Sequence, residues 1–202
     1  MTRPLSASST QVKWNRQDAN ILASSHSDEV FIWDRRVSHG SPHLAFYPLI
    51  VLSNIQKGSL PVCRIKAHSS KIYGIDWSHD VRNEIVTCSL DKTIKVWDMN
   101  VASVADTAVI QEPRTVIQTT YPVWRARNLP FGRGVLGLAQ RGTTSLEMYA
   151  QSSPQEPIEV FEGHTDVVKE FVWRKGENGM LQTFLIVFLS IHSSFVGQMI
   201  FN

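Results

Sequence analysis

The stretch HSSKIYGIDWSHDVRNEIVTCSLDKTIKVWD, residues 68–98, decides the fold of this chain. It carries four side chains at intervals that let them bond to one another: His68, Thr87, Asp91 and Trp97. The indole N–H of Trp97 can donate to the Thr87 hydroxyl, which can donate to one ring nitrogen of His68. The other ring nitrogen can donate to Asp91. Taken singly, the histidine reads as a core residue and the aspartate as a catalytic acid, but the ordered spacing predicts a structural relay without catalysis.

This spacing is typical of one blade of a WD-repeat β-propeller. Such a blade is a four-stranded sheet with the histidine before its first strand, the hydroxyl on the second, the aspartate in the next turn and the tryptophan on the third. At ~40 to 45 residues per blade, a chain of 202 residues holds about four units at most. We therefore predict an all-β fold, an incomplete WD-repeat propeller of about three and a half blades.

A second copy of the pattern lies near the N-terminus, in VKWNRQDANILASSHSDEVFIWD, residues 12–34. Apolar runs separated by turn-forming residues predict strands over 12–14, 21–24 and 30–33. No Gly-His or Ala-His pair precedes this copy, so Ser24, Asp28 and Trp33 are expected to form an incomplete relay that lacks the histidine.

A third unit can be traced over residues 122–150. We expect Trp124 to close its first strand, residues 135–139 to form the second and residues 145–149 the third, with Tyr149 in place of the tryptophan. The alternative is a loop-rich connector.

A fourth unit is predicted to open at Gly163 and His164. His164 precedes Trp173 by nine residues, as His68 precedes Trp77, and blade geometry sets this interval. We expect an opening strand here and no completed blade.

Two segments break the repeat, and they divide the chain into a partial propeller at 1–178, with an irregular insert at 37–57, and a hydrophobic tail at 179–202. The tail is uncharged and follows Arg174 and Lys175, so a membrane-anchoring helix is one interpretation. Polar residues interrupt it, however. The insert is too short to span a bilayer, and we expect either a loop or a hydrophobic interaction segment. Both segments could instead derive from a truncated or alternatively spliced product.

Composition argues for a protein of the reducing cytosol. Lys and Arg number 20 against 18 Asp and Glu, a net charge of +2, which disfavours nucleic acid as a partner. Cys63 and Cys88 lie 25 residues apart without a CxxC motif, so we expect small strand residues and no metal site. The first residues lack the apolar core of a signal peptide.

No enzymatic motif stands in the context that its chemistry needs. The sequence contains no GxSxG, HExxH or GxxxxGK[ST], and His26, His39 and His43 have no paired carboxylates. The glycines of FGRGVLG, residues 131–137, have the spacing GxGxxG, but they fall in and around a predicted strand with neither a following helix nor a basic residue placed for phosphate. We expect no catalytic residues and no cofactor. Propellers bind partners through loops of no fixed spacing, so the binding residues are not identifiable from the sequence.

Three stretches carry a more specific resemblance: KAHSSKIYGIDWSHD (66–80), PVWRARNLPF (122–131) and EGHTDVVKEFVWRK (162–175). In this order they make residues 10–36 and 59–175 similar to the WD repeat-containing protein 59 family, scaffold subunits of the GATOR complex in amino-acid-sensing TOR signalling. The resemblance covers part of an N-terminal propeller. The family's later RWD-type and RING-type regions have no counterpart here.

The resemblance implies a non-enzymatic scaffold that positively regulates TOR signalling from the cytoplasm and the lysosomal surface, through contacts with other WD-repeat subunits. Arg125 and Arg127 could pair with a partner, but a solvated face of a strand is the simpler expectation. Membrane contact is expected only through the 179–202 tail. The alternatives are a tail-anchored partial propeller and a truncated form that is non-functional or interferes with the complex.

Overall fold

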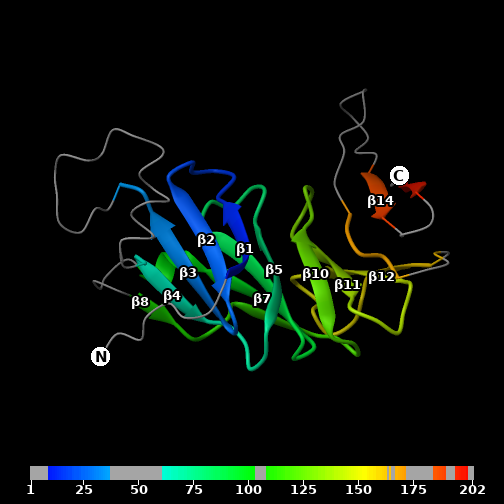
Figure 1. The fold of residues 1–202 in the computed structure, drawn as a ribbon, viewed down its shortest axis with the longest axis horizontal. Helices are drawn as coiled ribbons and strands as arrows, with labels where there is room; N and C mark the ends of the chain where they lie inside the picture. The colour runs from blue at the N-terminus through cyan, green and yellow to red at the C-terminus, as the bar shows by residue number, and fades with distance from the viewer. Residues whose placement is uncertain are drawn as a thin grey trace.

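The computed structural model describes residues 9–36, 61–102, 108–162, 164, 167–171, 184–189 and 194–199. Three β-sheets follow one another across the molecule as successive propeller blades, and the blue, green and yellow-green sheets of Figure 1 are the first, second and third blade. The innermost strand of the second blade contacts the innermost strands of both neighbours. The prediction of an all-β, incomplete propeller is confirmed, since the described residues contain strands and a single 3-10 turn.

Each blade has four antiparallel strands in sequence order. The first blade contains β1 (Ser9–Trp14), β2 (Ile21–His26), β3 (Glu29–Asp34) and β4 (Cys63–Lys66). The second contains β5 (Ile72–Trp77), β6 (Glu84–Ser89), β7 (Thr93–Asp98) and β9 (Thr115–Gln118). The third contains β10 (Val123–Asn128), β11 (Gly134–Ala139), β12 (Leu146–Ala150) and β13 (Glu159–Phe161). Between the second blade's third and fourth strands, η1 (Met99–Ala102) leads to β8 (Ala108–Ile110), which pairs in parallel with β4.

The three inner strands share one irregularity at the same position. A β-bulge shifts the register between Ser9 and Gln11, between Ile72 and Gly74, and between Val123 and Arg125. Each bulge twists its strand locally, which helps successive blades to fan out. At Gly74 a Cβ atom would lie 2.6 Å from the sulfur of Cys88 on the neighbouring strand β6, so a larger residue would displace that side chain, and it would also touch the Ala126 nitrogen of the third blade at 3.4 Å.

The core consists of apolar layers between successive blades. Ile32, Ile65, Trp77 and Trp97 belong to the layer between the first and second blades. A second layer joins the second and third blades, and β6 and β11 are buried along their whole length because both faces of the middle strands are covered. Continuous burial explains why the sequence of β11, GVLGLA, is apolar throughout and does not alternate, whereas β6, EIVTCS, also buries the polar residues Glu84, Thr87 and Ser89.

The third unit is a four-stranded blade and not the loop-rich connector considered above. One detail of its prediction is wrong: Trp124 is the second residue of β10 and does not close it. Asn128 occupies the last position, because it pairs with Val135 as Trp77 pairs with Ile85. The Arg-Ala-Arg-Asn sequence that follows Trp124 therefore continues the strand and does not begin a turn.

The fourth unit begins as expected in position but not in conformation. No strand is assigned over the described residues 164 and 167–171, although Phe171 and Val168 are buried against the third blade. Trp173 lies outside the described residues, as does the insert at 37–57.

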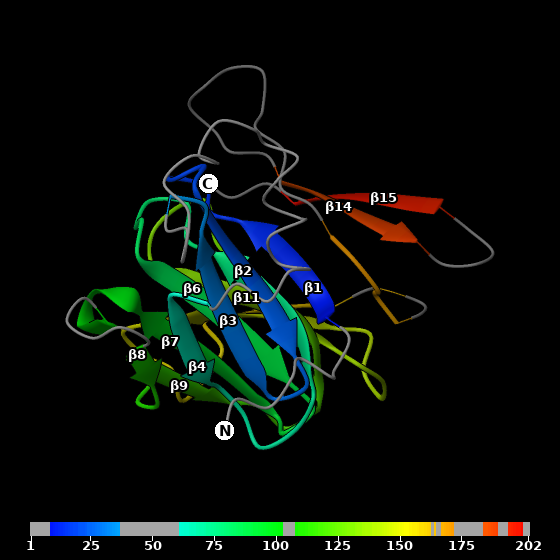
Figure 2. The same ribbon diagram turned by 60° about the vertical axis from the view of Figure 1, so that its left-hand side comes forward.

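The described part of the tail forms an antiparallel hairpin of β14 (Phe184–Leu189) and β15 (Ser194–Met199), drawn apart from the blades in Figures 1 and 2. This is not the helix that a membrane anchor would require in these two segments. Among the described residues, no helix is long and apolar enough to cross a bilayer.

Candidate functional site

The polar residues singled out in the second blade form one hydrogen-bonded chain. The Trp97 indole nitrogen donates to the Thr87 hydroxyl at 2.9 Å, and that hydroxyl lies 2.7 Å from Nε2 of His68. Nδ1 of His68 lies 3.0 Å from Oδ2 of Asp91. Strand β6 supplies the hydroxyl and β7 the indole, while the imidazole and the carboxylate come from the flanking turns. Sequence reasoning missed Thr93, whose hydroxyl donates to Oδ1 of Asp91 at 2.7 Å.

The electrostatics of this chain favour a neutral imidazole beside an ionised carboxylate. Burial lowers the pKa of His68 and outweighs the opposing effect of Asp91. Burial also opposes ionisation of Asp91, but hydrogen bonds from His68, Thr93 and the Ser69 backbone N–H outweigh it and lower the pKa of Asp91. Nδ1 of His68 therefore carries the proton and Nε2 accepts the Thr87 hydroxyl.

A hydroxyl, an imidazole and a carboxylate in this order have the connectivity of a nucleophilic triad. Two observations speak against that chemistry. Thr87 is fully buried, and its oxygen already accepts the indole N–H of Trp97. None of the four residues lines the cavity that lies between the second and third blades. A nucleophile needs access to a reacting atom, so the arrangement fits the satisfaction of buried polar groups better than catalysis.

The first blade contains a histidine in its polar chain, contrary to expectation. The Trp33 indole donates to the Ser24 hydroxyl at 2.8 Å, and Ser24 lies 3.0 Å from Nε2 of His26. The imidazole comes from the end of β2 and not from a loop before β1. Residues two apart on a strand point to the same face, so His26 reaches Ser24 directly. The repeat pattern places a blade's histidine before its first strand, so it does not single out His26 at the end of β2.

The third blade satisfies the corresponding positions differently. Register places Gly137 where the second blade has Thr87, and Tyr149 where it has Trp97. The hydroxyls of Tyr121 and Tyr149 both donate to Oε2 of Glu147, the former at 2.8 Å. Burial, followed by the Glu147 carboxylate, raises the pKa of both phenols. Tyr121 and Glu147 were not identified from the sequence.

Arg125 and Arg127 are neither on a solvated face nor free for a partner. Arg127 Nη2 lies 2.6 Å from Oε1 of Glu170, and Arg125 Nε lies 3.3 Å from Oε2 of the same carboxylate. Arg127 also lies 3.8 Å from the buried Asp76, which pairs with Arg16 at 2.8 Å. These ion pairs run from the first blade through the second and third to the fourth unit.

The cysteines show no sign of a metal centre. Both thiols are free and buried, and burial raises the pKa of Cys63 to about 11 and that of Cys88 to about 12. A thiol must lose its proton to bind a metal, so both are poor ligands. The described part of the chain contains no cluster of three or more His, Cys, Asp or Glu side chains that could hold an ion.

One face of the first blade packs against the second blade, whereas Trp14 and Val12 of the same blade are exposed. Trp77 in the second blade is 2% exposed because the first blade packs over it, and its indole donates to the Lys13 carbonyl at 3.0 Å. Trp14 holds the matching position in the first blade, since it pairs with Leu22 as Trp77 pairs with Ile85. Trp14 is 50% exposed and nearby Val12 53% exposed. The first blade therefore offers a sheet face of the kind that another blade covers elsewhere in the molecule.

Comparison with known proteins agrees with this geometry. The family model described as WD domain, G-beta repeat matches residues 59–98, which include β4 to β7. The chain is a WD-repeat protein with a partial-propeller fold.

Within that class it is similar to the GATOR2 complex protein WDR59 of Homo sapiens, at 34% identity over 179 residues, 86% of this chain and 15% of the relative. It is 35% identical to the GATOR2 complex protein Wdr59 of Drosophila melanogaster over 172 residues, 82% of this chain and 15% of the relative. An RWD, RING finger and WD repeat-containing protein of Schizosaccharomyces pombe is 36% identical over 176 residues, 84% of this chain and 11% of the relative. The chain thus spans only 11 to 15% of the length of these relatives.

Proposed function

We propose that this chain is a non-enzymatic protein-interaction scaffold that docks onto other WD-repeat subunits of a GATOR2-type complex. Through that complex it positively regulates TOR signalling in response to amino acids, in the cytoplasm and at the lysosomal surface. The similarity to WDR59 over most of the chain supports the choice of complex. The buried, mutually bonded polar residues of each blade support a binding role over a catalytic one.

One observation carries the docking role: the contrast between Trp14 and Trp77. The same sheet position is buried in the second blade and half exposed in the first. Aromatic residues are enriched at the centres of protein interfaces, where an apolar body and one N–H donor are both used. In the second blade Trp77 uses both against a neighbouring strand. A partner sheet that presents a backbone carbonyl would make the same contacts with Trp14.

The test is co-purification from cells that express the tagged chain. We expect the other WD-repeat subunits of GATOR2 to co-purify with it, and Trp14→Ser to reduce their recovery by about tenfold or more, as loss of an interface hot spot does. Val160→Ser is the matched control, because Val160 is also an exposed apolar strand residue, 40% exposed, but lies on the outer strand of the third blade. Failure of the parent chain to recover any subunit would refute the proposed complex, and equal losses with both variants would refute the assignment of the docking face.

We also propose that the chain divides into a propeller unit at 1–178 and a separate tail at 179–202. The described tail strands pair with each other and with no blade strand. Deletion of 179–202 should therefore leave the melting temperature of the propeller within about 2 °C of the parent value, as expected for a change well below 1 kcal/mol. A large fall in differential scanning fluorimetry would show that the tail belongs to the core.

A further inference from the structure

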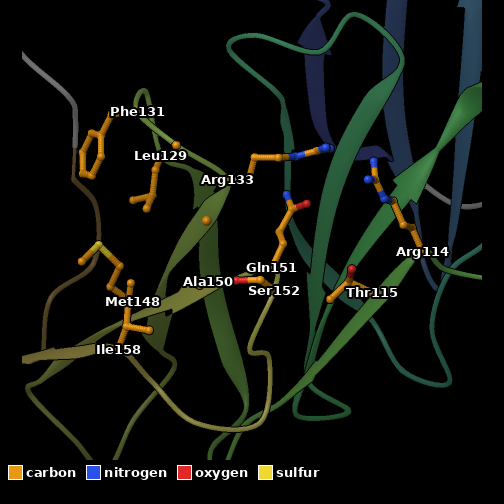
Figure 3. Close-up of a pocket in the computed structure, with 12 residues that line it drawn as sticks. Arg114, Thr115, Leu129, Phe131, Arg133, Met148, Ala150, Gln151, Ser152 and Ile158 are labelled. Atoms are coloured by element: carbon orange, nitrogen blue, oxygen red, sulfur yellow. The ribbon is translucent and has the colours of Figure 1, made fainter.

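A cavity of about 520 Å³ opens between the second and third blades, on the side of the molecule where their outer strands β9 and β13 begin. Figure 3 shows that its walls come from the start of β9, from the turn between β10 and β11, and from the end of β12 with the turn that follows it. It is separate from the polar chains of the three blades and from the open face of the first blade.

One end of this cavity is apolar. Leu129, Phe131, Met148 and Ile158 gather there, as the left half of Figure 3 shows. Leu129 and Met148 are buried parts of the third blade's core, whereas Ile158 is 53% exposed and borders the solvent. Gly134 keeps this wall close, because a Cβ atom there would lie 2.6 Å from a methyl carbon of Leu129.

The other end is cationic and is built on one buried carboxylate. Glu84, whose side chain is 3% exposed, accepts hydrogen bonds from Arg114 at 3.2 Å, from Gln151 at 3.0 Å and from Arg133. The three donors lie around the right half of Figure 3. The Arg114 and Arg133 side chains are 43% and 47% exposed. Two guanidinium groups thus share one carboxylate, which leaves one positive charge facing the cavity.

We infer that this groove binds a peptide segment of a partner protein that carries an acidic side chain close to a large aliphatic one. The guanidinium groups present planar N–H donors that match a carboxylate, and Glu84 holds both of them in place before the ligand arrives. The apolar end accepts a leucine-sized side chain, and the volume lies in the range of small ligand sites. A carboxylate of the ligand would neutralise the positive charge that remains after Glu84 has paired with both Arg114 and Arg133. This inference rests on the proposed interaction role and names the chemistry of one partner.

The test uses the full chain and fluorescein-labelled peptides of Gly and Ser that contain one Leu and one Glu, separated by zero to three residues. Fluorescence anisotropy should detect binding for at least one separation. Replacing the peptide's Glu by Gln or its Leu by Gly should weaken binding by about tenfold or more, the size of one charge-assisted hydrogen bond or one buried side chain. Added salt should weaken it further, because the arginines are partly exposed.

Protein variants locate the site. Arg133→Gln and Arg114→Gln should each weaken the same peptide by about tenfold, while Arg141→Gln, an exposed arginine on the turn between β11 and β12, should leave it unchanged. Ile158→Ser tests the apolar end at an exposed position that a correctly folded blade tolerates. Absence of binding by every peptide, or equal binding by the arginine variants and the control, overturns the inference. If no subunit co-purifies with a chain that still binds the peptides, the proposed complex is refuted while this inference stands.

Discussion

The second and third blades satisfy their buried polar groups with different side chains. In the second blade an indole, a hydroxyl, an imidazole and a carboxylate bond in sequence, from Trp97 to Asp91. In the third blade the hydroxyl position is Gly137, and two phenols converge on Glu147 instead. Both sheets keep the same register and the same bulge. The blade therefore requires that its buried polar groups be satisfied, and it does not require one particular set of residues.

The largest effect is expected from Trp97→Ala, which removes a fully buried aromatic side chain between the first and second blades. The cavity and the lost hydrogen bond should lower the free energy of unfolding by ~3 to 5 kcal/mol. Urea denaturation followed by circular dichroism measures it. Tyr149→Phe is the matched change in the third blade, and it should cost much less because it keeps the ring. Equal losses would contradict the distinct roles of the two aromatic positions.

Asp91→Ala should cost ~1 to 3 kcal/mol, because it removes the acceptor of the buried His68. The loss should fall near the lower end of that range, since Thr93 Oγ1 also lies 3.0 Å from Nδ1 of His68. The double variant with Thr93→Ala should then lose more than the two single changes predict from their separate contributions. Thermal melts identical to that of the parent would show that the chain from Trp97 to Asp91 does not stabilise the blade.

The two blades should respond to opposite extremes of pH. In the second blade the pKa of His68 is lowered by burial and that of Asp91 by its hydrogen bonds. Their contributions are present at neutral pH and are lost as the pH falls, from about 6.5 for the imidazole and about 4 for the carboxylate. In the third blade burial raises the phenol pKa of Tyr121 and Tyr149. That contribution is present below about pH 10 and is lost above it.

Unfolding free energies between about pH 4 and pH 11 would separate these effects. Tyr121→Phe should reduce the alkaline loss and leave the acid side unchanged, whereas His68→Gln should reduce the loss below about pH 6.5 and leave the alkaline side unchanged. A variant that changes the acid loss and the alkaline loss of stability equally would indicate a general effect on folding. It would count against assigning the acid loss to the second blade and the alkaline loss to the third.

The smallest effect is expected from Gly137→Ala, which adds one methyl group where the third blade packs on the second. A Cβ atom there meets Cδ1 of Ile94 at 3.1 Å and the Tyr121 hydroxyl at 3.6 Å, so the flexible Ile94 must shift slightly. This strain opposes the ~0.5 to 1 kcal/mol that alanine gains over glycine within regular structure, and the net change should stay within about 1 kcal/mol. A loss above about 3 kcal/mol, as found for overpacked cores, would show that the glycine is essential there.

The sequence predicted most of the sheets because each strand and turn leaves a local signal. The spacing of His68, Thr87, Asp91 and Trp97 sufficed to identify a set of residues that the structure brings together. The sequence wrongly placed Trp124 at the end of its strand and did not identify His26 as the partner of Ser24. Both errors concern which residue of a strand meets which neighbour. Strand register, and not composition, decides that.

By itself the sequence determined the class of fold: apolar strands separated by turns recur with polar groups at fixed intervals, which is the pattern of propeller blades. The tertiary structure alone decided where Arg127 finds Glu170 and Asp76, and where Arg114 and Arg133 find Glu84. Those partners lie between 30 and 51 residues apart in the chain. Arg127 and Arg133 meet theirs where one blade packs on the next, whereas Arg114 and Glu84 meet between strands of the second blade. Local patterns encode hydrogen bonds within a sheet, whereas contacts between sheets depend on how closely and at what twist the blades pack.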